Sequence, residues 1–462
     1  MQGYSPFDKP LRDLQSADLK ALKQASEGWY IEYKRETPNA VAIAKSLSAF
    51  ANTYGGWLFL GVQEESKVNP VAGEFPGLPR DEVDSSLQRL RKSAVDHLNP
   101  TPHFETKVLW GPDSEVGLAE GRAVICAWIP QSSSAPHIHR TGQIYRRVSD
   151  ASEPKAENDR FVLDQLWRRG DDIKHTHKDW YDRDPEFSTQ EKSQPYVRLM
   201  LIADRWAERG LWIDVHDDQV RAALGEPGEV IGIPFDTVHT SSDGFIGRQL
   251  KGNDPQNLTL TWRLRRSLVS DVFIPLPLFQ PDHRALLAQD LDGYMHTQRF
   301  IDLLGRYNTN ALRIVDLNYV FSVLIGVAEI QERLCKLAGW SESYHLKVKL
   351  LNCWRTIPYI DVADVLDRFE TYGPPMCLDS VAAFPRLPGP EDYLEIFRHP
   401  EVESSVGRVF SQAVAMFWPL ALLYGVPTWE EDKPVAAYHE ALQQAGRRAI
   451  DVQHRRNVRA RK

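Results

Sequence analysis

The stretch that decides the fold reads E-G-W-Y-I-E-Y-K-R-E at residues 27–36 and A-F-A-N-T-Y-G-G-W-L-F-L-G-V-Q-E-E at residues 49–65. Polarity alternates along most of the first part, which is typical of a half-buried strand. The second part contains an almost unbroken apolar run, Trp57–Val62. Such a run is typical of a strand that is covered on both faces. The sequence therefore predicts two strands here.

A helix is predicted between these two strands. Apolar and small residues recur there at helical spacing, as at Val41, Ala44, Leu47 and Ala51. The Gly55-Gly56 pair then ends the helix, as a glycine at a helix C-terminus does. A strand, a helix and a strand in this order form a β-α-β unit, whose strands are parallel and whose crossover is right-handed.

Three carboxylates and one lysine of this stretch are the candidate catalytic residues: Glu27, Glu32, Lys34 and Glu64. Residues i and i+2 of a strand point the same way, so Glu32 and Lys34 share a face. Glu64 follows the second strand, at the sheet edge where open α/β sheets place their ligands. Crowded carboxylates raise one another's pKa, and a divalent cation keeps them ionised. We therefore predict that Glu27, Glu32 and Glu64 bind Mg²⁺ or Mn²⁺, with Lys34 stabilising a phosphate.

A plainer interpretation stands beside each of these assignments. A single glutamate is usually a solvated surface charge, and only the three together indicate a site. Lys34 can equally form a simple ion pair with Glu32 or Glu36. His137 and His139 share a strand face, but two histidines without a third ligand are a weak metal signal. The arginines Arg140, Arg146 and Arg147 are predicted phosphate contacts, and a solvated sheet edge is the alternative.

Composition limits the class of protein. The chain has 462 residues, 42% of them hydrophobic, and a formal net charge of -8. That charge argues against broad coating of nucleic acid but leaves room for a local basic groove. No stretch of 18 consecutive apolar residues predicts a membrane span, and residues 1–14 lack the apolar core of a secretory signal. The four cysteines form no C-x-x-C pair, so we expect free thiols and a cytoplasmic protein.

The fold class that we predict is α/β, or α+β, with a mainly helical C-terminal region. Four segments are expected along the chain. They are an N-terminal domain at 1–169, a linker at 170–193 that is rich in Asp, Lys and His, a mixed α/β region at 194–282, and a helical C-terminal domain at 283–462. The basic residues between Gly446 and Lys462 are either a nucleic-acid arm or the charged end of a helix.

The N-terminal motifs resemble the Schlafen core, which is found in bacteria as the AlbA-type DNA-binding domain. The resemblance rests on E-x4-E-Y-K at residues 27–34, on A-F-A-N-T-x-G-G-x-L-x-L-G-V at residues 49–62, and on the acidic residue that follows. It is specific over residues 20–65 and looser to about residue 169, with Arg146–Ser152 similar to the closing strand and loop of the family. In nuclease members three acids form a metal site that cuts transfer and ribosomal RNA. By motif position they fall on Glu27, Glu32 and Glu64, the last replacing the usual Asp.

The resemblance implies a metal-dependent endoribonuclease that cleaves structured RNA such as tRNA. In a bacterium this activity would suit a toxin or an anti-phage effector, with the C-terminal half sensing a trigger, binding a protein partner or forming a homo-oligomer. RNA is the favoured nucleic acid, and DNA is the alternative. A non-catalytic DNA- or RNA-binding regulator is the second interpretation. An interaction module that works through the C-terminal half is the third.

Overall fold

The computed structural model folds into two compact units, Met1–Asp179 and Trp180–Lys462. Each unit has its own sheets and its own hydrophobic core. The structure describes residues 4–7, 9, 11–148, 153–205, 215–227, 235–280, 284–307, 313–340, 342–387, 389–398, 405–426 and 435–460.

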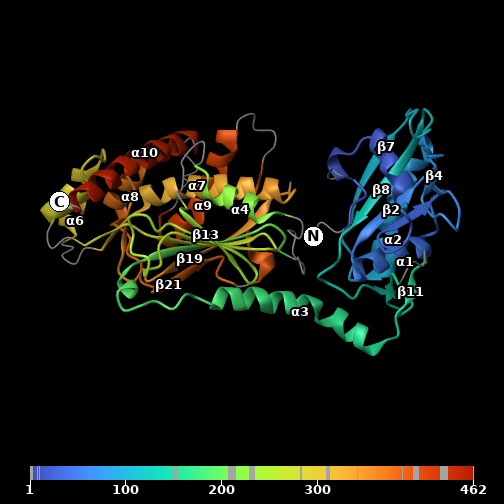
Figure 1. The fold of residues 1–462 in the computed structure, drawn as a ribbon, viewed down its shortest axis with the longest axis horizontal. Helices are drawn as coiled ribbons and strands as arrows, with labels where there is room; N and C mark the ends of the chain where they lie inside the picture. Colours follow the sequence, from blue (N-terminus) through green and yellow to red (C-terminus); the bar gives the residue numbers. More distant parts are fainter. Residues whose placement is uncertain are drawn as a thin grey trace. The chain divides into compact units, whose positions relative to one another are not determined.

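The N-terminal unit is built on a five-stranded sheet, and the predicted β-α-β unit forms one edge of it (Figure 1). β1 and β2 pair in parallel, with Glu32 opposite Leu58, and α1 connects them. The parallel pairing that we predicted is therefore confirmed. The bounds of these elements are β1 (Ile31–Lys34), α1 (Ala40–Asn52), β2 (Gly56–Leu60), β5 (Leu78–Pro79), β7 (Glu105–Trp110) and β8 (Arg122–Ile129).

Gly55 is required where the chain leaves α1 and enters β2. Its φ of 75° lies in the left-handed region, which favours glycine. A Cβ at this position would also lie 2.8 Å from the carbonyl oxygen of Ile129. The glycine therefore ends the helix and lets β2 approach β8 closely.

Both faces of this sheet are covered, which places successive residues of β1 in different layers. On one face, α1 and α2 (Arg80–His97) pack through residues such as Leu47 and Leu90. The other face packs against two short 3-10 helices, η1 (Leu11–Asp13) and η2 (Ser16–Gln24). Because strand residues alternate, Glu32 faces α1 while Tyr33 faces η2.

Short strand pairs and a long helix complete the unit. The short strands are β3 (Gln63–Glu64) with β4 (Ala72–Glu74), β6 (Leu98–Asn99) with β9 (Ile138–His139), and β10 (Tyr145–Arg146) with β11 (Lys155–Ala156). The predicted boundary between the N-terminal domain and the linker lies after residue 169, whereas α3 (Arg160–Asp182) continues through it into the predicted linker. Leu166, Ile173 and His177 are its buried residues, and their near-helical spacing was missed among the surrounding charges.

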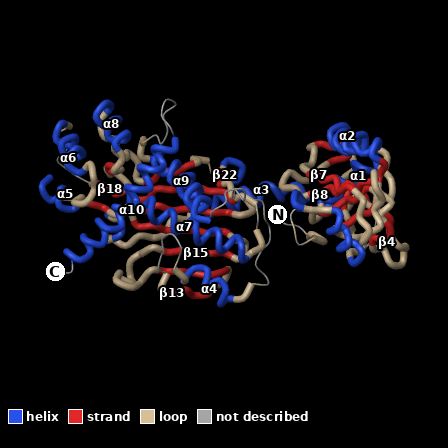
Figure 2. Tube along the Cα trace, turned by 90° about the horizontal axis from the view of Figure 1, so that it is seen from above, coloured by secondary structure: helices blue, strands red, loops and turns tan. Residues whose placement is uncertain are grey.

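The C-terminal unit contains an eight-stranded sheet in which β12 lies between β16 and β19. Figure 2 labels β13, β15 and β22 of this sheet. β12 belongs to the region that we predicted as mixed, and β19 to the region that we predicted as helical. The structure corrects that division, because both regions share one sheet and one core. The strands are β12 (Tyr196–Ile202), β13 (Thr237–Ser241), β14 (Gly244–Arg248), β15 (Thr261–Arg265), β16 (Val269–Pro275), β19 (Tyr344–Leu351), β21 (Val381–Phe384) and β22 (Leu394–Ile396).

A layer of helices lies on one side of the large sheet (Figure 1), and a separate three-stranded sheet contributes to the same hydrophobic core. The small sheet consists of β17 (Leu278–Phe279), β18 (Ile314–Asp316) and β20 (Ile357–Tyr359). The helices and remaining 3-10 turns are η3 (Glu191–Ser193), α4 (Asp217–Gly225), α5 (Arg284–Asp290), α6 (Thr297–Arg306), α7 (Leu317–Leu337), α8 (Ala363–Tyr372), η4 (Pro390–Asp392), α9 (Ser405–Leu423) and α10 (Val435–Ala460). Residues 291–296 separate α5 from α6.

Helix α9 is the one described helix whose length and apolar composition would suit a membrane span. Met416, Phe417 and Leu420 of this helix are buried in the core of the unit. A core helix meets the same criteria of length and composition, so this helix is weak evidence for a membrane span.

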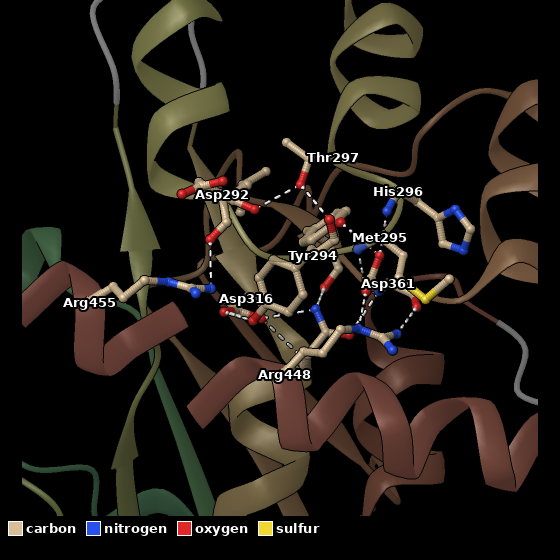
Figure 3. Close-up of polar contacts among 12 residues, drawn as sticks. Asp292, Tyr294, Met295, His296, Thr297, Asp316, Asp361, Arg448 and Arg455 are labelled. Atoms are coloured by element: carbon tan, nitrogen blue, oxygen red, sulfur yellow. Dashed lines mark hydrogen bonds and ion pairs between the residues drawn. The ribbon is translucent and has the colours of Figure 1, made fainter. Parts of the chain in front are cut away.

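Arginines of the basic C-terminal segment hold helix α10 against the rest of its unit, and Figure 3 shows two of them, Arg448 and Arg455. Arg448 donates to Asp361 over 2.8 Å, Arg455 to the carbonyl of Asp292 over 3.1 Å, and Arg456 to the carbonyl of Leu278 over 3.0 Å. These arginines hold the helix end against the protein, which favours the plainer of our two predictions for the segment. Residues 461 and 462 lie outside the described residues.

Candidate functional site

Glu32 is the centre of a buried charge cluster at the end of β1. Its side chain is 2% exposed, and both of its carboxylate oxygens have partners. Oε1 accepts from the Ser46 hydroxyl and lies 2.9 Å from Lys34 Nζ, while Oε2 lies 3.0 Å from Arg147 Nη1. Lys34 keeps 34% of its side chain exposed. The cluster therefore joins a buried acid to a cation that solvent can reach.

Glu27 lies where the chain bends before β1, close enough to Glu32 and Lys34 to feel their charges. Its Oε1 accepts from the backbone N–H of Tyr33 over 2.5 Å. Burial is the main cause that raises the pKa of Glu27 to about 7, and the charges of Glu32 and Glu64 act in the same direction. The hydrogen bond from Tyr33 and the charge of Lys34 oppose this rise. Near neutral pH this carboxyl group can therefore either hold or release a proton.

Glu64 is the least constrained of the three predicted acids. It is half-buried in β3, two residues after Val62, whose N–H donates to the carbonyl oxygen of Lys34. Its charge acts on Glu27, so the two carboxylates lie within electrostatic range of each other. In the described part of the chain, Glu64 and the second oxygen of Glu27 have no hydrogen-bond donor.

The donors suit a hard divalent cation by their chemistry, because all three are carboxylates. Among the residues that the structure describes, however, no group of three or more His, Cys, Asp or Glu side chains is arranged to hold a metal ion. Ser46, Lys34 and Arg147 contact the two oxygens of Glu32. Lys34 is the partly exposed one of these three partners. The metal site at Glu27, Glu32 and Glu64 stays a prediction.

Arg147 is the buried cation that holds the cluster together. It is fully buried and donates to the carbonyl oxygens of Gly28 and Ile31 as well as to Glu32. Its guanidinium lies 4.8 Å from the centre of the Phe50 ring, so it also contacts α1. One side chain thus holds the bend after Glu27, the strand that carries Glu32, and the helix that carries Ser46.

The three arginines that we predicted as phosphate contacts have different surroundings. Arg147 is 0% exposed, so the prediction that it contacts nucleic acid is wrong. Arg146 forms an ion pair with Glu157 over 2.7 Å. Arg140 is exposed and remains a candidate. Residues 149–152, the end of the motif, lie outside the described residues.

Two contributors to the site were missed or misjudged from the sequence. Ser46 lies in the predicted helix, on the face of α1 that is turned toward β1. This position could have indicated that Ser46 is a partner of Glu32. Arg147 follows Arg146 in a strand-like stretch, and alternation alone puts one of the two inward. The side-chain amide of Asn52 donates to the backbone carbonyls of His137 and Tyr145, and its oxygen accepts from the N–H of His137.

Comparison with known proteins gives a family match and two solved structures. The model of the family "Schlafen, AlbA_2" matches residues 27–156. The N-terminal domain of a RecG-related protein from Nitrosomonas europaea is 22% identical, covers 31% of this chain and 89% of its own, and has a TM-score of 0.23. The DIP2311 protein from Corynebacterium diphtheriae is 14% identical, with a TM-score of 0.20, and the match covers 46% of this chain and 33% of that one.

The family match includes every member of the charge cluster. Glu27, Glu32, Glu64 and Arg147 all lie within the matched residues, and α3 and the C-terminal unit lie outside them. The match assigns nucleic-acid binding or a nuclease-type function to this part of the chain. The N-terminal unit is therefore a domain of the Schlafen, AlbA_2 family.

Proposed function

We propose that the N-terminal unit is a metal-dependent endoribonuclease that cleaves structured RNA such as tRNA. The observation that carries the proposal is the pairing of buried Glu32 with the partly exposed Lys34 at the end of β1. Buried acids destabilise a fold unless they are fully paired, so the incompletely paired Glu27 beside Glu32 and the partly exposed Lys34 favours a functional role. Glu27, Glu32 and Glu64 would hold Mg²⁺ or Mn²⁺.

Each residue of the cluster has a distinct role in this proposal. A bound divalent cation supplies charge stabilisation at the phosphate and lowers the pKa of a bound water. Lys34 Nζ moves from Glu32 Oε1 to a phosphate oxygen when RNA binds, which places a positive charge where negative charge develops. Glu27, with a pKa of about 7, can accept a proton near neutral pH. Ser46 and Arg147 keep the Glu32 carboxylate in place throughout.

The test is cleavage of total tRNA by the full chain in Mn²⁺ or Mg²⁺, with EDTA as one control. Glu32→Gln removes the charge and keeps the shape, and we expect it to lower the cleavage rate by about 100-fold or more. Glu36→Gln is the matched control, because Glu36 lies in the same stretch but is exposed. Cleavage that persists in Glu32→Gln or in EDTA would contradict the proposed site.

A second candidate function is a non-catalytic nucleic-acid-binding regulator. The full occupation of both Glu32 oxygens by Ser46, Lys34 and Arg147 favours it. For this candidate, the full chain binds tRNA with an affinity that falls steeply with salt and leaves the tRNA intact in either metal. The same tRNA experiment therefore separates the two functions.

The proposed cleavage would suit a toxin or an anti-phage effector, with the C-terminal unit sensing a trigger, binding a protein partner or mediating self-association. Expression of the wild-type chain would then arrest growth, and expression of Glu32→Gln would not. Equal growth of the two strains at equal protein levels would contradict the toxin role.

A further inference from the structure

A rigid turn in the C-terminal unit carries a tryptophan and an arginine toward solvent. Residues 352–356 connect β19 to β20, and Asn352 and Arg355 both have a φ of 58°. Residues other than glycine rarely adopt this left-handed backbone conformation, so the surrounding contacts must hold the turn. Asn352 Nδ2 donates to the carbonyls of Glu191 and Gln194, and Thr356 Oγ1 donates to the carbonyl of Cys353. Cys353 and Thr356 therefore point inward, while the two residues between them point outward.

The outward residues belong to a mixed apolar and basic patch. Trp354 is 46% exposed, and the Arg355 guanidinium lies 5.5 Å from the centre of its ring. Backbone hydrogen bonds of 2.8 and 2.9 Å join the turn to Cys377, whose neighbours Met376 and Leu378 are exposed. Arg313 lies beside the turn and donates to the carbonyl of Trp354. We call these residues the Trp354 patch: Arg313, Trp354, Arg355, Met376 and Leu378.

The described carboxylates do not neutralise the two arginines of the patch. Arg313 donates to two backbone carbonyls, those of Trp354 and Ser193, and its Nε has no partner. In the part of the chain that the structure describes, neither Arg313 nor Arg355 forms an ion pair with a carboxylate. A chain with a net charge of -8 thus presents uncompensated positive charge at this patch.

We propose that the Trp354 patch binds single-stranded nucleic acid. A base would stack on the exposed face of Trp354, and Arg355 and Arg313 would contact the neighbouring phosphates. Charge complementarity favours this ligand, and the fixed turn limits the conformational entropy lost on binding. The proposal rests on the nucleic-acid-binding function of the N-terminal family and does not require that the chain cleaves RNA.

The test is fluorescence anisotropy of a labelled oligouridylate mixed with the full chain carrying Glu32→Gln, in EDTA, so that cleavage does not interfere. We expect Trp354→Ala to weaken binding by about 5- to 100-fold, the range for loss of one stacked base. Trp354→Phe should restore most of the affinity. Arg355→Gln should reduce the slope of log Kd against log salt by about one.

Trp110→Ala is the matched control. Trp110 is 43% exposed and has Arg80 at 5.5 Å from its ring, but Arg80 is followed by two acids, Asp81 and Glu82. We expect this variant to bind as the parent does. Equal affinity of Trp354→Ala, Arg355→Gln and the parent would overturn the proposal, and a protein ligand would then be the better explanation of the patch. Loss of binding in Trp354→Ala supports it even if the wild-type chain cleaves no tRNA.

Discussion

The two units bury acidic side chains in different ways, and the difference separates a site from a structural contact. Asp361 of the C-terminal unit is 1% exposed, and each of its oxygens has two donors, among them Arg448 Nε and the N–H of His296 (Figure 3). Glu27 of the N-terminal unit has one donor on one oxygen and two neighbouring carboxylates. Complete pairing holds α10 in place, whereas incomplete pairing leaves a carboxylate ready to bind something else.

The largest effect on stability is expected at Arg147. Arg147→Met would remove the buried cation of Glu32, leaving only the partly exposed Lys34, and would release the bend at Gly28. Breaking a buried ion pair on one side costs about 3–5 kcal/mol, which we expect to appear in urea unfolding of the full chain as a shift of the N-terminal transition. Arg140→Met, at an exposed position, should change stability by less than about 0.5 kcal/mol. Similar shifts for both variants would show that the cluster is not a folding element.

Glu27→Gln should stabilise the fold at high pH. The native pKa of about 7 exceeds the ordinary value of 4.5, so the folded chain binds a proton that the unfolded chain has already lost between these values. Stability therefore falls as the pH rises toward 7, and the charged form costs about 3 kcal/mol above that. Gln avoids this cost. The variant should be more stable than wild type well above pH 7 and equally stable near pH 4. No difference between the two at high pH would remove the evidence for a costly charge.

The equivalent change in the C-terminal unit should have the opposite sign. In Asp361→Asn an amide N–H₂ would face donors such as Arg448 and the N–H of His296, and at least one of them would lose its acceptor. An unpaired buried polar group costs about 1–3 kcal/mol, so we expect destabilisation of this size in thermal unfolding. If Asp361→Asn instead stabilised the chain, the contrast between the two clusters would fail.

The smallest change in stability is expected at Lys34. Its ion pair with Glu32 is partly exposed, so Lys34→Met should alter the free energy of unfolding by less than about 1 kcal/mol. If Lys34 contacts a phosphate, the same variant should lose about 10-fold or more of its tRNA cleavage rate. A large loss of stability with unchanged cleavage would mean that Lys34 stabilises the fold and does not contact the phosphate.

The sequence predicted the N-terminal unit better than the C-terminal one, for physical reasons. Around Glu32 and Trp57 the pattern is local: two strands, a helix and a glycine stop follow one another, and adjacent segments pair. In the C-terminal unit, β12 pairs with β19 almost 150 residues later. No local pattern reports such a pairing, so Tyr344–Leu351, with its buried Lys347 and Lys349, was not recognised as a central strand.

The site itself was predicted by residue type but not by pairing. Glu32 and Lys34 lie together as the strand periodicity requires, and Glu27, before the strand, lies within electrostatic range of both. Arg147 was misassigned because it is 115 positions from Glu32, and no local pattern indicates that so distant a cation pairs with this carboxylate. A basic residue near a predicted phosphate site can equally hold the acids that form it.

The most direct test of the central claim is a crystal of the full chain grown with Mn²⁺, with anomalous diffraction recorded at the manganese edge. We predict a peak bounded by Glu27, Glu32 and Glu64, with Lys34 Nζ moved away from Glu32 and Arg147 unmoved. A chain that binds Mn²⁺ elsewhere, or whose Lys34–Glu32 pair stays intact under saturating Mn²⁺, would contradict the assignment of this cluster as a metal-dependent active site.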